Sequence, residues 1–164
     1  MSNYAISKIT YCPNITLVTL PSVPHDSQII SRILTAISDN GINVDMISQT
    51  APQGSNIGIS FTISSDSIGA LLPIVNSFKP EYPELRCDIM SGAAKINFYD
   101  ANMVNTPGVA AGVFSMLSEA GVQVYMITTS TVDISLLVLD HELEPSLTLC
   151  REKLKIETEE VPFE

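Results

Sequence analysis

The sequence predicts an α+β fold made of two βαββαβ units, each with an antiparallel sheet that carries its helices on one face. The main observation is a repeat: the stretch Gly41–Thr50 (GINVDMISQT) returns about 80 residues later as Gly121–Ser130 (GVQVYMITTS). Each copy follows an apolar pattern of helical period and precedes a short run that alternates as strands do. An internal repeat of this kind indicates that one structural unit occurs twice.

The first unit reads in order as strand, helix, strand, strand, helix and strand. The strand at 15–20 is rich in apolar residues, Pro21–His25 ends it, and Asp26 or Ser27 caps a helix that Gly41 stops. The later elements are predicted at 42–50, 57–63, 68–78 and 85–90, with a turn at 51–56 and capping residues at 64–67.

The second unit repeats this order up to its last strand. A strand is predicted at 94–100, and Thr106 caps a helix that has Pro107 at its first position and stops at Gly121. A hairpin at 122–131 and 133–139 and a helix at 142–155 follow. Residues 156–164 are acidic and contain a proline, so they do not predict a fourth strand.

The chain has one spare strand at its beginning, residues 4–11, which ends at Cys12–Asn14. A sheet that lacks a strand would expose unpaired N–H and C=O groups. We therefore expect the spare strand to complete the second sheet. The first domain, 14–91, is then an insertion within the second domain, which consists of 92–164 and the strand 4–11.

Composition narrows the class of function. The chain has 164 residues, a formal net charge of −10 and only eight Lys and Arg, which argues against a nucleic-acid partner, because phosphates need clustered cations. No apolar run reaches the roughly 18 residues of a membrane span, so no membrane partner is expected. Three cysteines, Cys12, Cys87 and Cys150, lie far apart in the sequence. Such spacing is typical of a protein in a reducing cytoplasm rather than of a disulfide framework. No metal pattern and no glycine-rich phosphate loop is present, so we expect no metal and no cofactor.

Three segments carry a resemblance to a known family. The strand Gly41–Ile47 with the following Gln49, the loop Thr106–Ala111 (TPGVAA) and the hairpin Ile127–Val138 (ITTSTVDISLLV) are similar to a GINVDMI strand, an HPGVAA loop and an ISTSEIKISVLV hairpin. With the βαββαβ order, the chain resembles paired ACT domains of ferredoxin-like fold, in particular the regulatory region of aspartokinase (aspartate kinase). The similarity covers roughly residues 4–155.

The chain departs from this family at two places. The family's first loop reads Asp-x-Pro-Gly, whereas this chain has Ser22-Val23-Pro24-His25. In the second hairpin, Thr131 and Asp133 stand where the family has a glutamate and a basic residue. The kinase domain that binds aspartate and ATP in the family is absent from this sequence, so the resemblance implies no catalysis by this polypeptide alone.

The sequence offers one site hypothesis with a mechanism, which is the binding of a small amino acid. N–H groups of a loop that enters a helix can hold the ligand's carboxylate, and aspartates can take its ammonium group. Gln49 can add a side-chain contact, and two residues of the second repeat can add backbone groups from a facing unit. The candidate ligand-binding residues are Ser22, Val23, Pro24, His25, Asp26, Ser27, Asp45, Gln49, Gln123 and Val124. In the alternative interpretation, Asp26 is only a helix cap, and Asp45 and Gln49 only face solvent.

The preferred hypothesis is a non-catalytic, cytoplasmic regulatory protein that binds a small amino acid at an interface between ACT units of a dimer. The resemblance suggests threonine or lysine as the ligand and allosteric control of amino-acid biosynthesis as the role. One alternative is a regulatory subunit or fragment of an aspartate kinase, which would have a kinase catalytic chain as partner. Another is an interaction scaffold without a ligand.

Overall fold

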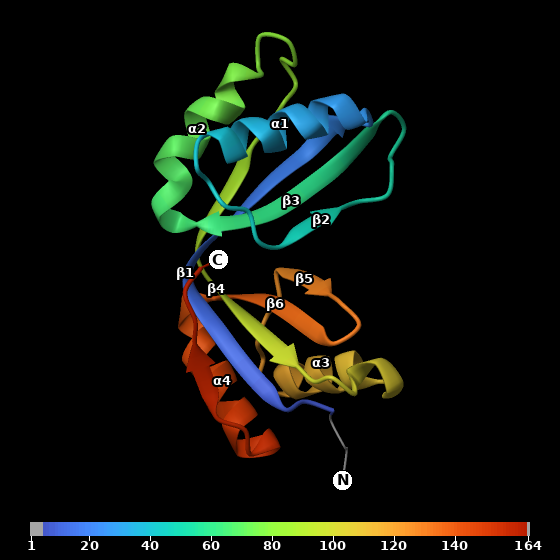
Figure 1. Ribbon diagram of the computed structural model, residues 1–164, viewed down its shortest axis with the longest axis vertical. Coiled ribbons are helices and arrows are strands. Elements are labelled where there is room, and N and C mark those ends of the chain that lie inside the picture. The colour runs from blue at the N-terminus through green and yellow to red at the C-terminus, as the bar shows by residue number, and fades with distance from the viewer. Residues whose placement is uncertain (1–4, 164) are drawn as a thin grey trace. The chain divides into compact units, whose positions relative to one another are not determined.

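The computed structural model describes residues 5–163. Tyr4, the first residue of the predicted N-terminal strand, lies outside the described residues, as do residues 1–3 and 164. The chain folds as two compact units (Figure 1). The inserted unit consists of residues 14–92, and the split unit consists of the described residues up to Pro13 together with Ala93–Pro162.

In the inserted unit, two helices cover one face of an antiparallel sheet (Figure 1). The strands lie in the order β2-β3-β1-β4, and β3 pairs antiparallel with both β1 and β2. The elements of this unit are β1 (Lys8–Pro24), α1 (Ser27–Asp39), β2 (Ile47–Gln49), β3 (Asn56–Ser64), the 3-10 turn η1 (Ser65–Ser67), α2 (Ile68–Ser77) and the beginning of β4 (Asp88–Tyr99).

The split unit repeats this arrangement. Its strands lie in the order β1-β4-β6-β5, with β6 antiparallel to both β4 and β5. The N–H of Ser7 donates to the carbonyl of Tyr99 at 2.9 Å, just before the first residue of β1. The further elements are η2 (Met103–Asn105), α3 (Val109–Glu119), β5 (Met126–Thr129), β6 (Asp133–Leu139), α4 (Asp140–Leu154) and β7 (Thr158–Glu160). The predicted α+β fold with two ferredoxin-like units is confirmed.

The strand β1 is continuous, so the predicted division into strands at 4–11 and 15–20 is wrong. The strand passes through Asn14, whose φ is 61°, a left-handed value that asparagine adopts more readily than most residues. The pairing with β3 shifts register between Leu20 and Val23, so the strand continues through Pro21 to Pro24. Prolines are tolerated at such bulges, and for this reason they did not end the strand.

The strand β4 likewise joins two predicted strands, at 85–90 and 94–100, into one element. Gly92 lies within it at a φ of 72°, a conformation that glycine reaches without steric cost. The predicted break between residues 90 and 94 is therefore absent, and the strand continues through Gly92.

The first helix of the split unit does not begin as predicted. The Thr106 hydroxyl donates to the carbonyl of Asn102 at 3.1 Å, so Thr106 ends the 3-10 turn η2 rather than capping α3. Gly108, with φ of 92°, takes the cap position instead. Pro107 therefore precedes the helix and is not its first residue.

The acidic C-terminal segment forms a short strand that the sequence did not predict. Thr158–Glu160 pairs in parallel with Ile9–Tyr11 of β1. Lys8 Nζ lies 3.1 Å from Glu159 Oε2, and Arg151 Nη1 donates to the Thr158 hydroxyl at 2.8 Å. These cationic partners offset the low strand propensity of the segment.

The repeated stretches contribute shorter strands than expected, because only 47–49 and 126–129 are paired as β2 and β5. Before β2, the chain is fixed by burial: Ile42 and Met46 are buried, and the Met46 N–H donates to the Thr62 hydroxyl at 3.0 Å. The rest of the stretch therefore lies against the sheet without forming a ladder.

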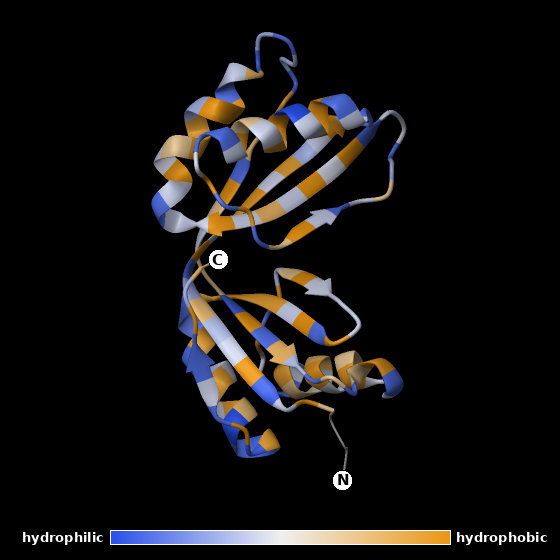
Figure 2. Ribbon diagram, viewed as in Figure 1, coloured by the Kyte–Doolittle hydropathy of each residue, from blue (hydrophilic) through white to orange (hydrophobic). Residues whose placement is uncertain are grey.

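Each unit has its own apolar core, as the alternating hydropathy along the strands indicates (Figure 2). Phe61 in the inserted unit and Phe98 in the split unit are fully buried. The helices contribute further core residues, including Ile29, Ile33 and Ile37 from α1 and Val113, Met116 and Leu117 from α3. The spacing of these residues along α1 and α3 matches the helical period of the sequence.

We predict that Phe61→Ala lowers the free energy of unfolding by about 3–5 kcal/mol, because it removes a buried ring and leaves a cavity. Val104→Ala is the control: Val104 is 60% exposed, so this change is expected to cost less than about 0.5 kcal/mol. Urea unfolding followed by circular dichroism measures both. Equal effects of the two changes would contradict the assigned core.

Candidate functional site

Six of the candidate ligand-binding residues lie where β1 passes into α1, a segment that we call the β1–α1 loop: Ser22, Val23 and Pro24 end β1, His25 and Asp26 connect the two elements, and Ser27 begins α1. The structure gives these residues different roles. Val23 is fully buried, so its side chain belongs to the core. The Ser22 hydroxyl accepts a hydrogen bond from Asn56 Nδ2 at 2.9 Å. The His25 N–H donates to the Ser55 carbonyl at 2.8 Å. The loop is therefore held against the start of β3.

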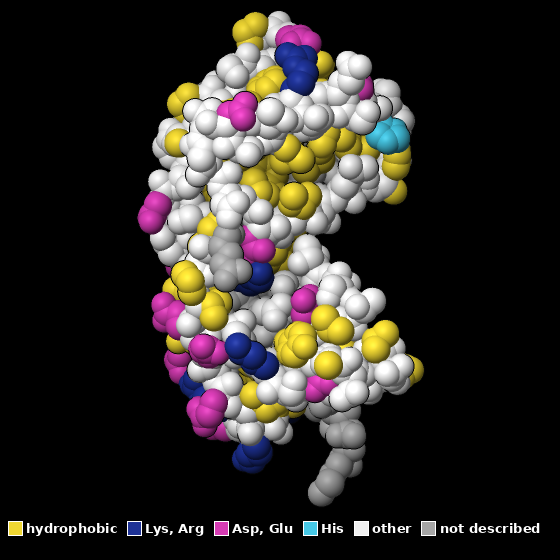
Figure 3. Space-filling model, in the orientation of Figure 1, with side chains coloured by type: hydrophobic (Ala, Val, Ile, Leu, Met, Phe, Trp, Pro, Cys, Tyr) yellow, Lys and Arg dark blue, Asp and Glu magenta, His cyan; other side chains and the backbone are white. Residues whose placement is uncertain are grey.

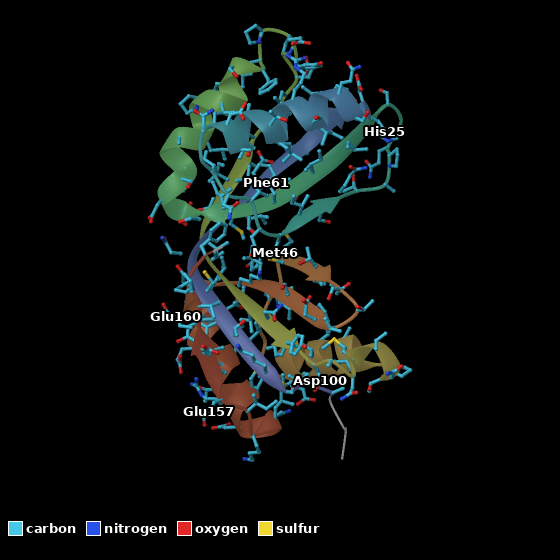
Figure 4. All side chains as sticks on the ribbon, in the orientation of Figure 1. His25, Met46, Phe61, Asp100, Glu157 and Glu160 are labelled. Atoms are coloured by element: carbon cyan, nitrogen blue, oxygen red, sulfur yellow. The ribbon has the colours of Figure 1, made fainter. Side chains whose placement is uncertain are left out.

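The end of this loop caps the helix. Asp26 Oδ1 accepts the N–H of Gln28 at 2.9 Å, and Ser27 is the first residue of α1. Both Asp26 and Ser27 are exposed, as is His25, which Figure 4 shows where β1 passes into α1. A carboxylate at this position is favourable for the helix dipole. The capping role of Asp26 is thus present, and one of its oxygens is engaged.

The two candidate residues around β2 differ in exposure. The Asp45 N–H donates to the Thr62 carbonyl at 3.1 Å, and the residue is half-buried. Gln49 pairs with Ile59 and is exposed on the outermost strand of the sheet. Ile47, on the same strand, is 48% exposed, which is unusual for a large aliphatic side chain at a sheet edge.

Gln123 and Val124 belong to the split unit. The N–H of Gln123 donates to Glu142 Oε1 at 3.0 Å, and Glu142 Oε2 also accepts the N–H of Leu139. The sequence hypothesis assigned the backbone of Gln123 to a ligand, but the Gln123 N–H already donates to the Glu142 carboxylate. The structure places these two residues in a different unit from the loop and β2.

A hollow of about 320 Å³ in the inserted unit was missed by the sequence analysis. We call it the hydroxyl hollow. Thr19 and Ser60 lie 3.1 Å apart between their hydroxyl oxygens, and the Thr50 hydroxyl accepts the N–H of Gly58 at 2.8 Å. It is lined by Thr19, Pro21, Ser22, Thr50, Gln53, Asn56, Ile57, Gly58 and Ser60. The available signal was the alternation of small polar residues with buried apolar ones along β1 and β3.

A second hollow, of about 250 Å³, adjoins the first, since Ser22 and Asn56 line both. We call it the carboxylate hollow. Its lining residues are Ser22, Pro24, Asn56, Glu81, Tyr82, Pro83, Glu84 and Leu85. No role was predicted for residues 81–84, and Leu85 was expected only to begin a strand. No sequence pattern links them to the loop.

A charged pair fixes one wall of the carboxylate hollow. Arg32 of α1 donates to both oxygens of Glu81, at 2.8 and 2.7 Å, and its guanidinium lies 5.5 Å from the centre of the Phe78 ring. The hydrogen bonds from Arg32 lower the pKa of Glu81. Partial burial and then the hydrogen bond with Glu81 raise the pKa of Tyr82.

The described residues offer no group of three or more His, Cys, Asp and Glu side chains that could hold a metal ion. None of the described helices is long and apolar enough to cross a membrane. Burial raises the pKa of Cys150 to about 11 and also raises the pKa of Cys87, so neither thiol is activated as a nucleophile. On the face shown in Figure 3, Lys and Arg side chains of the described residues do not gather into a patch.

We predict that the Arg32–Glu81 pair stabilises the protein in a pH-dependent way. A carboxyl whose pKa is lowered by folding contributes stability that is complete above its unfolded pKa and is lost as the pH falls through its folded pKa. The ordinary value for Glu81 is 4.5, so Glu81→Gln should lower the melting temperature slightly at pH 7. The difference from the unchanged protein should shrink below pH 4.5.

Thermal unfolding followed between about pH 2 and pH 8, which spans the ordinary pKa of the carboxyl group, measures this effect. Glu152→Gln is the matched control, because Glu152 is exposed and has no ion pair among residues 5–163. A Glu81→Gln protein that melts like the unchanged one at every pH would show that the pair contributes nothing.

Comparison with protein families gives one match. A family model described as ACT domain matches residues 22–70 and residues 96–154. The first segment lies in the inserted unit and the second in the split unit.

Comparison with individual proteins gives several matches. An aspartokinase of Bacillus sp. (strain MGA3) is 30% identical over 141 residues, which cover 86% of this chain and 34% of that protein. The crystal structure of aspartate kinase from Synechocystis superposes with a TM-score of 0.88 at 25% identity, over 94% of this chain and 28% of that chain. The ligand-free regulatory subunit of aspartate kinase from Thermus thermophilus gives a TM-score of 0.78 at 25% identity, over 90% of this chain and 97% of that chain.

The chain thus spans about a third of the length of the curated relatives it matches, but nearly all of that regulatory subunit. The resemblance to paired ACT domains and to the regulatory region of aspartokinase is confirmed.

Proposed function

This chain belongs to the ACT domain family, and we propose that it is a regulatory protein that binds a small amino acid. The observation that carries the proposal is coverage: the chain matches 97% of a regulatory subunit of aspartate kinase. We further propose that the inserted unit and the split unit are one ACT domain each, the first placed within the second. The division of the chain into two compact units, with boundaries in the sequence at residues 13–14 and 92–93, supports this assignment.

We place the amino acid on the inserted unit, between the β1–α1 loop and β2. Asp26 has Oδ2 left for an ammonium group, since its Oδ1 caps the helix. Asp45 lies beside Thr62, six residues along β3 from Asn56, which pairs with Pro24, so it is roughly 20 Å from the loop and is a candidate for the ammonium group only from a second copy of the chain. The exposed Gln49 can contact the ligand's side chain. The ligand's carboxylate would take N–H groups of the loop that enters α1. Threonine and lysine are the first ligands to test.

We propose that two copies of the chain form a dimer that completes this site. The strands β2 and β5 lie at the two ends of the strand order. Apolar side chains on them are exposed, Ile47 by 48% and Ile127 by 43%, as is Tyr125, just before β5, by 43%. Exposed apolar edge strands pair readily with another chain. A ligand that binds one arrangement of the dimer more tightly would shift the population towards it.

A second candidate function is that of a regulatory subunit whose partner is a separate kinase catalytic chain. The coverage favours it, because the chain corresponds to about a third of the Bacillus aspartokinase. Co-expression with a catalytic aspartokinase chain tests it, since a regulatory subunit should co-purify in a fixed ratio. A homodimer recovered alone would count against this assembly. Catalysis by the chain itself is not part of either candidate.

We predict that one or a few of the twenty amino acids raise the melting temperature of the protein. A ligand that binds only the folded state stabilises it, by about 2.7 kcal/mol when its concentration is 100 times its Kd. A thermal-shift screen at millimolar concentration measures this. If no amino acid changes the melting temperature, the ligand-free scaffold is the better interpretation.

Asp45→Asn tests the site in the same assay. Loss of a charged hydrogen bond costs about 1.5–3 kcal/mol, so the affinity should fall about 10- to 100-fold. Asp39→Asn is the control, because Asp39 is an exposed acid at the other end of α1 and should leave the affinity unchanged. Equal affinity of the Asp45→Asn protein would place the ligand elsewhere.

A further inference from the structure

We propose that the carboxylate hollow of the inserted unit binds a small primary amine that carries an apolar body. The hollow adjoins the proposed amino-acid site, with which it shares Ser22 and Pro24. Its charged groups come from the segment that follows α2, which none of the family motifs in this sequence includes.

The shape of the hollow suits a small, partly apolar molecule. Its volume of about 250 Å³, set against about 30 Å³ for one water, gives room for roughly six to eight non-hydrogen atoms. Leu85, which is 4% exposed, lines it together with Pro24 and Pro83, and the Tyr82 ring adds an aromatic wall. Sites for small molecules typically combine such apolar walls with a few polar groups.

The charges of the hollow select a cation. Its lining contains two carboxylates, Glu81 and Glu84, and no Lys, Arg or His. Arg32 compensates Glu81 through two hydrogen bonds, whereas Glu84 has no ion pair in the described part of the chain. One of the two acidic residues that line the hollow, the exposed Glu84, therefore has no compensating cation among the described residues. The net charge of −10 adds to the attraction of cations and to the repulsion of anions.

The walls are held in place without a ligand. The Arg32–Glu81 pair ties the segment to α1, the Tyr82 N–H donates to the Phe78 carbonyl at 2.8 Å, and the Leu85 N–H donates to the Tyr82 carbonyl at 3.0 Å. On the other side, Asn56 donates to Ser22. A site that is formed in advance spends little binding free energy on ordering its walls.

Titration of the full chain with n-pentylammonium chloride, followed by 1H–15N NMR, tests the proposal. The expected result is saturable binding with a Kd on the order of millimolar, as for other ligands of this size, and shifts confined to residues near Ser22, Asn56 and Glu81–Leu85. Pentanol, which has the same apolar body without the charge, should bind more weakly, and pentanoate should not bind. Binding of pentanoate as tight as that of the amine would overturn the proposal.

Glu84→Gln is the decisive variant. An exposed carboxylate pairs weakly with a cation, so the affinity for pentylammonium should fall about two- to five-fold, and Glu152→Gln, which removes the same charge from α4, should not change it. If the two variants bind alike, the amine is held by net charge alone and the site does not exist. Asp45→Asn should leave amine binding intact, so a failure here is distinguishable from a failure of the amino-acid site.

Discussion

The fold depends on two strands that belong to both units. β1 and β4 each contribute one part to the inserted unit and one part to the split unit. Each changes unit at a residue in the left-handed region, Asn14 with φ of 61° and Gly92 with φ of 72°. Asn14 is also anchored by its side chain, since its Nδ2 donates to Asp66 Oδ1 at 3.1 Å. If either strand were lost, both sheets would be left with unpaired backbone groups at the same time.

This constraint explains which parts of the fold could be predicted. The helices followed from their apolar period, because a helix buries one stripe whatever its neighbours are. The strands were harder, because Pro13 and Pro21 look like breaks in the sequence and are tolerated in the structure beside a left-handed residue and a bulge. Strand β7 could not be predicted, because the side chains that hold it come from other elements. Lys8 is far away in the sequence, and Arg151 lies on α4.

The candidate site shows the same limit. The loop at Ser22–Ser27 was found from its position before a helix, which is a local property. The two hollows depend on contacts between residues far apart in the sequence, such as Arg32 with Glu81 and Thr19 with Ser60. No spacing rule in one sequence predicts these contacts. The hydrogen bond of Gln123 to Glu142 is a similar case: a backbone donor that seemed available from the sequence is already bonded.

The altered loop has a physical consequence for any ligand. Where the Asp-x-Pro-Gly pattern would place an aspartate, Ser22 makes a neutral hydrogen bond with Asn56, so the one carboxylate left in the segment from Ser22 to Ser27 is that of Asp26, whose Oδ1 caps α1. The backbone of the loop is unaffected, because Val23 remains buried and His25 keeps its bond to Ser55. A cationic group at this loop therefore depends on Asp26 Oδ2 or on an acceptor from a neighbouring segment. The fold can therefore be kept while the ligand changes, because the shared strands β1 and β4 determine the fold, whereas exposed side chains of the loop determine which charges a ligand meets.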